Sequence, residues 1–146
     1  MKICLCGSIA FYDQMVEVRR RLENLGNDVM LPPAEIIDAE GKKISVTEFY
    51  NLRKNVSDEE SWLWQRKREA IKDHFDKITW CDAILVMNYD KKGIANYIGG
   101  NTLLEMGIAL YLNKPIYLWQ PIPEIDYKEE ILAMFPVVID GDLKKI

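Results

Sequence analysis

Two patterns of apolar residues alternate along the chain: short uninterrupted runs, and longer stretches with an apolar residue every three or four positions. The runs are typical of buried parallel strands and the stretches of amphipathic helices. Strands are predicted at 3–6, 28–31, 82–87, 116–119 and 137–139. Helices are predicted over 13–25, from about 57 to 80, over about 101–112 and over 127–134. The first helix has its apolar face at Met15, Val18, Leu22 and Leu25.

The order of these elements predicts an α/β fold. A strand, a helix and a second strand follow one another within about 30 residues, which is a βαβ unit with parallel strands. We expect one domain over residues 1–146. Its architecture would be a doubly wound, flavodoxin-like or Rossmann-like three-layer sandwich of about five parallel strands. The first and third strands would then flank the switch point where such folds bind ligands.

Residues 34–56 interrupt the alternation. Gly41-Lys42-Lys43 is typical of a turn, and we expect short helices on either side of it. Because this connection is unusually long, it predicts a mobile or substrate-covering segment. Ser57-Asp58-Glu59-Glu60 then resembles the start of a helix with an acidic first turn.

Two glycine-bearing loops follow the strands at the predicted switch point. Glycine lets a ligand approach the backbone closely, and a helix N-terminus offers unpaired N–H groups to a phosphate or sugar. Turn formation, and helix capping by Asn101 or Thr102, are compatible with such binding. The candidate substrate-binding residues are Gly7, Ser8, Ile9, Gly99, Gly100, Asn101 and Thr102.

Glu105 is predicted to lie in the first turn of the helix after the second loop. An acid there would compete with an anionic ligand unless it takes part in chemistry beside it. The other interpretation is that Glu105 only stabilises the helix dipole. Both interpretations stay open from position alone.

Composition excludes several classes of function. The net charge of −4 predicts no broad basic face, so we expect no nucleic-acid polymer as partner. No apolar run approaches the roughly 20 residues needed to span a bilayer. The N-terminal residues are typical of a strand rather than a signal peptide, so we expect a cytoplasmic protein without membrane attachment.

The cysteines and glycine motifs point away from metals and nucleotide cofactors. Cys4 and Cys6 alternate along a strand and face the same side. With no C-x-x-C and a single histidine, we interpret all three cysteines as buried core thiols and expect no metal site. The chain also lacks the phosphate-binding motif of Walker-type NTPases, the G-x-G-x-x-G of dinucleotide enzymes and the G-x-S-x-G of serine hydrolases.

Three stretches resemble the nucleoside 2-deoxyribosyltransferase superfamily, including its 2'-deoxynucleoside 5'-monophosphate N-glycosidase branch. They are Cys6-Gly7-Ser8-Ile9, Cys81-Asp82, and Glu105-Met106-Gly107-Ile108-Ala109 with the following Asn113-Lys114-Pro115. The resemblance implies an enzyme that cleaves or transfers the N-glycosidic bond of a (deoxy)nucleoside or its 5'-monophosphate. It implies that Glu105 attacks C1' of the sugar, with no cofactor.

The proton donor of that family is replaced here. In relatives, an aspartate that protonates the leaving base lies eight residues before the aspartate that opens the third strand. Counting back from Asp82 gives His74. On the predicted helix His74 lies roughly 60° from the centre of the apolar stripe, whereas Asp73 and Asp76 point to solvent. His74 could protonate a base near neutral pH, or it could be a core-edge histidine with satisfied hydrogen bonds.

Two further departures leave alternatives open. Ala10 stands where the monophosphate hydrolases carry a basic residue, and the glycine loop lacks their serine-glycine pattern. One alternative is a non-catalytic nucleotide-binding module. Another is a ribonucleoside-monophosphate phosphoribohydrolase of the cytokinin-activating type, whose Gly-Gly-x-Gly-Thr-x-x-Glu loop is similar to residues 99–105 but one residue longer.

Aromatic residues suggest a base-stacking surface and a partner surface. Packing in the core or an interface is the other role of the candidate stacking residues, which are Trp62, Trp64, Trp80, Trp119 and Tyr12. Trp62-Leu63-Trp64 is apolar on more than one side of its helix, which predicts contact with a second copy of the chain. We therefore expect a homodimer or higher homo-oligomer, as the family resemblance also implies.

Overall fold

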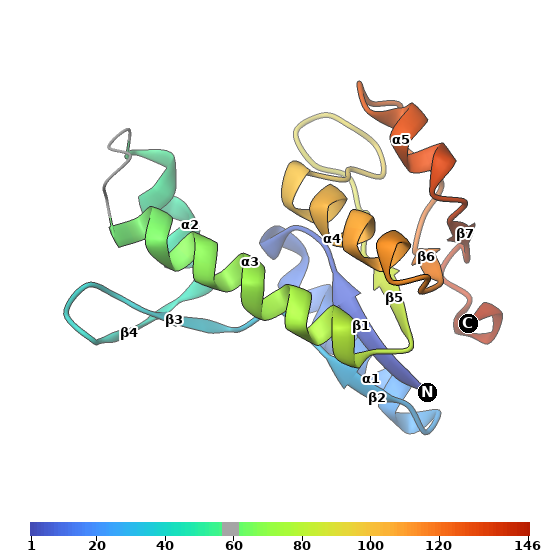
Figure 1. Ribbon diagram of the computed structural model, residues 1–146, viewed down its shortest axis with the longest axis horizontal. Helices are drawn as coiled ribbons and strands as arrows, with labels where there is room; N and C mark the ends of the chain where they lie inside the picture. Colours follow the sequence, from blue (N-terminus) through green and yellow to red (C-terminus); the bar gives the residue numbers. More distant parts are fainter. Residues whose placement is uncertain (57–61) are drawn as a thin grey trace.

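The fold is built on a five-stranded parallel sheet. The computed structural model describes residues 1–56 and 62–146. Its sheet has the order β2-β1-β5-β6-β7, with every neighbouring pair parallel (Figure 1). The predicted α/β fold with flavodoxin-like strand order is thus confirmed. The strands are β1 (Lys2–Cys6), β2 (Asp28–Met30), β5 (Ala83–Val86), β6 (Ile116–Leu118) and β7 (Val137–Val138).

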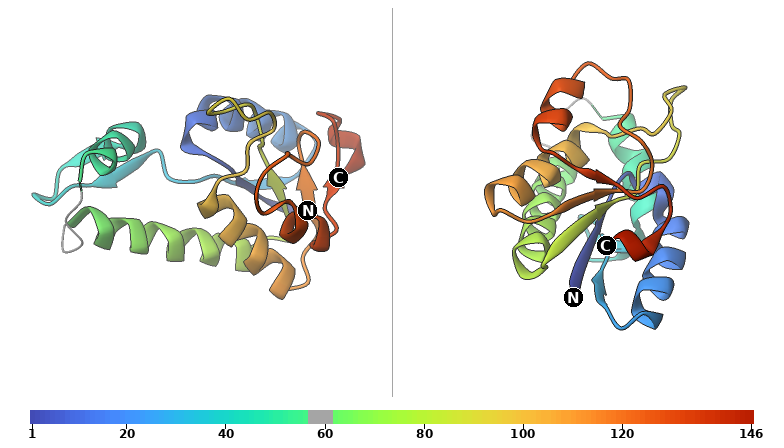
Figure 2. Two further views of the ribbon diagram at one scale, coloured as in Figure 1. Left: turned by 90° about the horizontal axis from the view of Figure 1, so that it is seen from above. Right: turned by 90° about the vertical axis from the view of Figure 1, so that its right-hand side faces the viewer.

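Helices cover both faces of this sheet (Figure 2). On one face α1 (Tyr12–Asn24) packs with the C-terminal 3₁₀ turn η2 (Leu143–Lys145). On the other lie α3 (Trp62–Trp80), α4 (Gly100–Tyr111) and α5 (Lys128–Ala133). A second 3₁₀ turn, η1 (Ile9–Phe11), joins β1 to α1. The α1 face buries Met15, Val18 and Leu22 as predicted, but Leu25 lies beyond the helix end and is exposed.

A small lobe extends from the sheet alongside the N-terminal half of α3 (Figures 1 and 2). It consists of β3 (Glu35–Ile37), β4 (Lys43–Ser45) and α2 (Val46–Lys54). The prediction of a helix before the Gly41 turn is therefore wrong, because that segment forms strand β3. Isoleucines on both sides of the turn favour strands, and the two segments pair antiparallel. Arg66 of α3 fixes this hairpin by donating a hydrogen bond from Nε to the Ile37 carbonyl at 2.9 Å.

The lobe also explains the apolar start of α3. Leu63 is buried against Ile44 and Phe49, and the Trp62 ring lies 6.0 Å from the Phe49 ring. The prediction that Leu63 belongs to a partner surface is therefore wrong, because the chain's own lobe covers it. The helix start expected at 57–60 lies outside the described residues. Oligomerisation stays a prediction.

None of the helices described for this chain combines the length and the apolar character that crossing a membrane requires.

Candidate functional site

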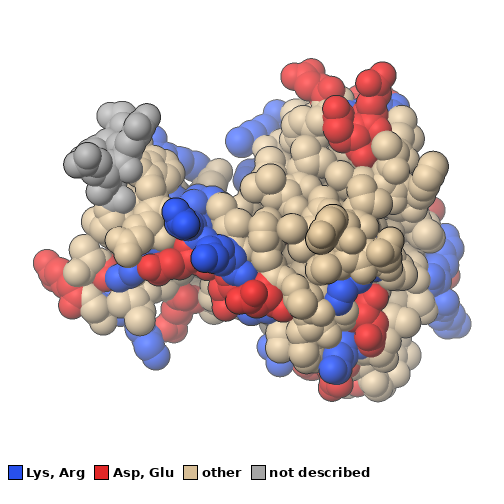
Figure 3. Space-filling view, viewed as in Figure 1, with Lys and Arg blue, Asp and Glu red and all other residues tan. Residues whose placement is uncertain are grey.

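A cavity of about 230 Å³ opens at the carboxyl ends of β1 and β5, where the lobe faces the sheet. The space-filling view shows the hollow between the lobe and the body of the protein (Figure 3). The long connection over residues 34–56 does cover it, since Ile36 of β3 and Val46, Phe49, Tyr50 and Arg53 of α2 line one wall. The structure brings all of the predicted site residues to this cavity: Gly7, Ser8, Ile9, His74, Gly99, Gly100, Asn101, Thr102 and Glu105.

Glu105 lies deeper in its helix than predicted. Because α4 begins at Gly100, Glu105 is in the second turn, and its side chain enters the protein with the residue only 4% exposed. A helix dipole acts mainly on the first turn, so the dipole interpretation loses its basis. Capping by Asn101 or Thr102 is also wrong, because Gly99 occupies the N-cap and no side chain caps it.

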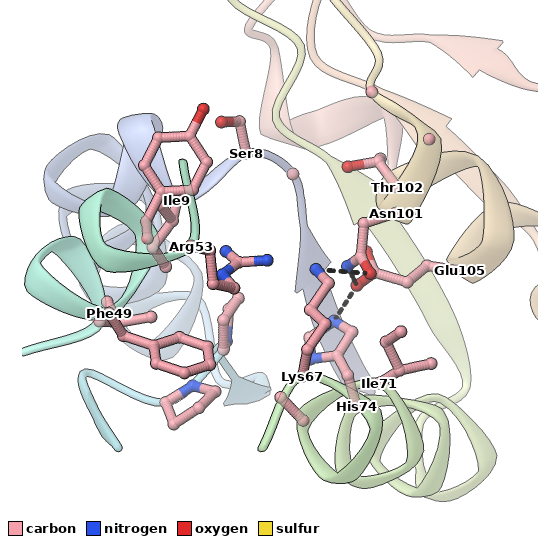
Figure 4. Close-up of a pocket in the computed structure, with 18 of the residues that line it drawn as sticks. Ser8, Ile9, Phe49, Arg53, Lys67, Ile71, His74, Asn101, Thr102 and Glu105 are labelled. Carbon is pink, nitrogen blue, oxygen red and sulfur yellow. Dashed lines mark hydrogen bonds and ion pairs between the residues drawn. The ribbon is translucent and has the colours of Figure 1, made fainter. Parts of the chain in front are cut away.

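A short chain of hydrogen bonds orients the Glu105 carboxyl group (Figure 4). Lys67 Nζ donates to Asn101 Oδ1 at 3.1 Å, and Asn101 Nδ2 donates to Glu105 Oε1 at 2.9 Å. An ammonium group can only donate, so the Asn101 oxygen must face Lys67 and its NH₂ group must face Glu105. The other carboxyl oxygen, Oε2, has no hydrogen-bond partner in the part of the chain that the structure describes.

His74 of α3 lies directly beside this carboxyl group. The residue is 3% exposed, and its Nε2 is 3.8 Å from Glu105 Oε1. Asp73 and Asp76, its acidic neighbours, are exposed as predicted. The second ring nitrogen of His74, Nδ1, finds no hydrogen-bond partner within the described ranges. This nitrogen does not fit the interpretation of a core histidine with satisfied hydrogen bonds.

Burial makes the Glu105–His74 pair compete for protons near neutral pH. Loss of solvent raises the pKa of Glu105 to about 7, against the opposing charges of His74 and Lys67. Burial lowers the pKa of His74, but hydrogen bonding with Cys4 and the charge of Glu105 outweigh it and raise that pKa above its ordinary value. Such a pair can supply a carboxylate and a proton donor at the same pH.

Positive side chains surround the rest of the cavity. Arg53, Lys67, Lys91 and Lys92 line it, and Glu105 is the only acid among its described lining residues. Lys91 Nζ donates a hydrogen bond to Ser8 Oγ at 2.6 Å. Sequence reasoning missed these cations, having sought one at position 10. The available signal was Lys91-Lys92 in the turn after the third strand, whose carboxyl end meets the Ser8 loop.

The aromatic residues of the cavity also differ from those expected. The described residues that line it include Phe49, Tyr50 and Tyr97. The cavity is not lined by any of the five residues proposed from sequence for base stacking, which are Trp62, Trp64, Trp80, Trp119 and Tyr12. Trp119, for example, is buried in the α1-side core with Tyr89, their ring centres 6.3 Å apart. Of the two roles considered for these five residues, the structure therefore favours packing over base stacking.

Both strand cysteines lie against His74. Cys6 Sγ is 3.4 Å and Cys4 Sγ 3.6 Å from His74 Nε2, and all three residues are buried. The three ligand-type atoms lie within 4.8 Å of one another. The expectation that the cysteines serve only as core thiols overlooked this grouping.

Comparison with known proteins gives a likeness of fold. No protein-family model and no curated protein matches the sequence. A 2-deoxyribosyltransferase from the psychrotolerant bacterium Bacillus psychrosaccharolyticus is 19% identical with a TM-score of 0.50, covering 81% of this chain and 71% of its own. A CMP N-glycosidase, BcmB, from Clostridium botulinum is 15% identical with a TM-score of 0.48, and the match covers 95% of this chain and 86% of the glycosidase. The predicted α/β fold is thus shared with a 2-deoxyribosyltransferase.

Proposed function

We propose that this protein is an enzyme that cleaves or transfers the N-glycosidic bond of a nucleoside 5'-monophosphate, with Glu105 as the nucleophile. The observation that carries this proposal is the placement of Glu105, a buried carboxyl group at the end of a cationic cavity, whose Oε2 accepts no hydrogen bond from the described residues. A carboxylate nucleophile at an anomeric carbon divides a difficult displacement into two easier steps.

In the first step a Glu105 oxygen forms a bond to C1' while the bond from C1' to the base nitrogen breaks. The electron pair of that bond goes to the base, and His74 supplies the proton that neutralises it. Water or a second base then attacks C1' and releases Glu105. The 3.8 Å between His74 Nε2 and Glu105 Oε1 favours this covalent route. Inverting enzymes instead hold their two catalytic groups roughly 6.5–9.5 Å apart to admit a water.

The phosphate of the substrate would bind at the cationic end of the cavity. Lys91, held by Ser8, approaches from the loop after β5, and Arg53 approaches from α2. The Nε of Arg53 is buried without a hydrogen-bond partner among the described residues, so it is available to an anionic ligand. A phosphate would offset the positive charge of these side chains, whereas an uncharged nucleoside would not. We therefore expect monophosphates to be preferred over free nucleosides.

Release of free base tests this proposal. Deoxynucleosides, ribonucleosides and their 5'-monophosphates are each incubated with the protein, with and without an acceptor base, and the products are separated chromatographically. We expect base release from a monophosphate, lost in Glu105→Ala, and a KM for that monophosphate that rises roughly tenfold or more in Lys91→Ala. Absence of base release from every substrate would overturn the proposal. The sugar preference also decides whether the ribonucleotide-specific alternative applies.

A nucleotide-binding module without turnover is the second candidate. The contact between His74 and Glu105 favours it, because an ion pair between them would occupy both groups. This candidate predicts that a monophosphate binds to the protein without release of base. Glu105-dependent base release would exclude it.

A further inference from the structure

The proposed reaction makes no use of the two thiols beneath its candidate catalytic residues. Cys4 and Cys6 are free cysteines on one face of β1, and neither is accessible to solvent. Their side chains point to the face covered by α3 and α4, where both sulfurs lie close to His74 Nε2. Three potential metal-binding side chains from two elements therefore gather at one point, with Glu105 of α4 beside them.

One nitrogen of His74 lies close to both sulfurs. The imidazole Nε2 either carries one proton to donate or has one lone pair to accept. It can therefore form one good hydrogen bond with a thiol, yet two sulfurs lie 3.4 and 3.6 Å from it. Both separations agree with shared ligation of a metal. In a tetrahedral zinc site with Zn–S bonds of about 2.3 Å and Zn–N bonds of about 2.0–2.1 Å, sulfur and nitrogen ligands lie about 3.6 Å apart.

Glu105 lies beside this group of three donors rather than within it. Its Oε1 is 3.8 Å from the same His74 nitrogen, on the side of the group that faces the cavity. Two thiolates, an imidazole and a carboxylate are ligands that Zn²⁺ and similar cations take in tetrahedral geometry. Within the described residues no other group of three such side chains comes equally close together.

We propose that Cys4, Cys6 and His74 form a binding site for a thiophilic divalent cation such as Zn²⁺, and that the Glu105 side chain shifts toward them to supply the fourth ligand. On binding, the two thiols lose their protons to solvent and His74 binds through Nε2 while its proton resides on Nδ1. The site is reached through the cavity, which His74 and Glu105 both line. Its consequence rests on the proposed function: a bound cation would hold both the nucleophile and the proton donor, so the metal-bound protein would be inactive.

Cobalt titration tests the site without any substrate. The full-length protein, reduced and treated with a chelator that is then removed, is titrated with Co²⁺ under argon. We expect one equivalent to produce thiolate-to-cobalt charge transfer and the intense visible bands of tetrahedral cobalt, both abolished by one equivalent of Zn²⁺. Cys4→Ala and Cys6→Ala should each weaken cobalt binding roughly a hundredfold or more.

Cys81→Ala is the matched control, because Cys81 is equally buried but donates its thiol to the Ile78 carbonyl at 3.1 Å. It should bind cobalt as the wild type does. Circular dichroism confirms the fold of each variant, and Cys6→Ser provides a conservative replacement if an alanine variant unfolds. Absence of charge transfer in the wild type, or equal cobalt binding in the folded Cys4 and Cys6 variants, would overturn the proposal.

Inhibition is measured separately from binding. Zn²⁺ should abolish base release by the wild type and by Cys81→Ala, and chelator should restore it. In Cys4→Ala, each rate being compared with that variant's own metal-free rate, the same Zn²⁺ concentration should inhibit far less. If the wild type binds cobalt but releases no base, the metal site stands and the proposed function fails. If the wild type releases base but does not bind cobalt, the proposed function stands and the metal site fails.

Discussion

The two faces of β1 bury residues of different kinds. Ile3 and Leu5 point to α1 and join a core of apolar side chains. Cys4 and Cys6, which alternate with them, point to α3 and α4, where His74 and Glu105 are buried as well. One strand thus divides a face that only stabilises the protein from a face that also carries its candidate chemistry.

The difference shows how the fold can tolerate a costly site. Burying an apolar side chain stabilises the folded state by roughly 1.5–3 kcal/mol, and the α1 face consists of such side chains. Burying a carboxyl group and an imidazole instead destabilises the folded state unless both groups are fully hydrogen-bonded. Glu105 Oε2 and His74 Nδ1 lack hydrogen-bond partners among the described residues. We infer that the α1 face stabilises the sheet enough for the opposite face to retain these groups.

The largest expected effect on the chemical face comes from Glu105→Gln, which keeps the shape of the side chain but removes the nucleophile. Base release should fall roughly 10³-fold or more, while monophosphate binding, measured by calorimetry, should persist because the cations remain. Leu104→Ala, a change at the exposed preceding residue of α4, is the control and should leave the rate unchanged. A Glu105→Gln variant that releases base at the wild-type rate would remove Glu105 from the mechanism.

The next effect is expected from His74→Gln. Loss of a proton donor typically costs roughly 10²–10⁴ in rate. In the wild type kcat should rise with pH as Glu105 ionises around its pKa of about 7, and fall at higher pH as His74, whose pKa is raised, loses its proton. The variant should lose the fall at high pH. An unchanged pH profile would return His74 to a packing role.

The apolar face should respond in stability rather than in activity. Leu5→Ala removes a fully buried side chain and should lower the free energy of unfolding by about 2–5 kcal/mol. The rate per folded molecule should not change. Leu25→Ala, at a leucine exposed beyond the end of α1, should change stability by no more than about 0.5 kcal/mol. Urea unfolding measures both. Equal destabilisation by the two changes would contradict this picture of the α1 face.

The same division explains what the sequence could predict. Short apolar runs and helical spacing are properties of neighbouring residues, and they located the sheet and its covering helices. The hairpin of β3 and β4 escaped because its strands, Glu35–Ile37 and Lys43–Ser45, lack the uninterrupted apolar run of three or more residues that located the strands of the sheet. Its pairing depends on contacts with α3, such as the one between Arg66 and the Ile37 carbonyl.

The site was partly predictable for a related reason. Glycine loops and Glu105 follow strands that meet at the switch point, so topology alone could bring them together. Arg53 comes from the lobe, and Lys91 from a turn whose side chain must reach back to Ser8. The cysteine–histidine group escaped because a search for C-x-x-C considers neighbours in sequence. Here alternate residues of β1 place Cys4 and Cys6 on one face, and α3 brings His74 against them although it lies 68 residues after Cys6 in the sequence.

The smallest effect is the dependence of stability on pH, and it compares the two faces most directly. The folded protein holds the pKa of Glu105 at about 7, above its value of 4.5 in an unfolded chain. A raised carboxyl pKa means that its stabilising contribution is complete below pH 4.5 and is lost as pH rises to about 7. Glu105→Gln has no such proton to lose. Its free energy of unfolding should therefore match that of the wild type near pH 4 and exceed it by on the order of 1–3 kcal/mol near pH 8.

Glu17→Gln on exposed α1 is the control. The hydrogen bond from Arg20 lowers the pKa of Glu17, so any effect there should be slight and of opposite sign. Parallel stability curves for Glu105→Gln and the wild type between pH 4 and 8 would show that the buried carboxyl group is not the strained element of the chemical face.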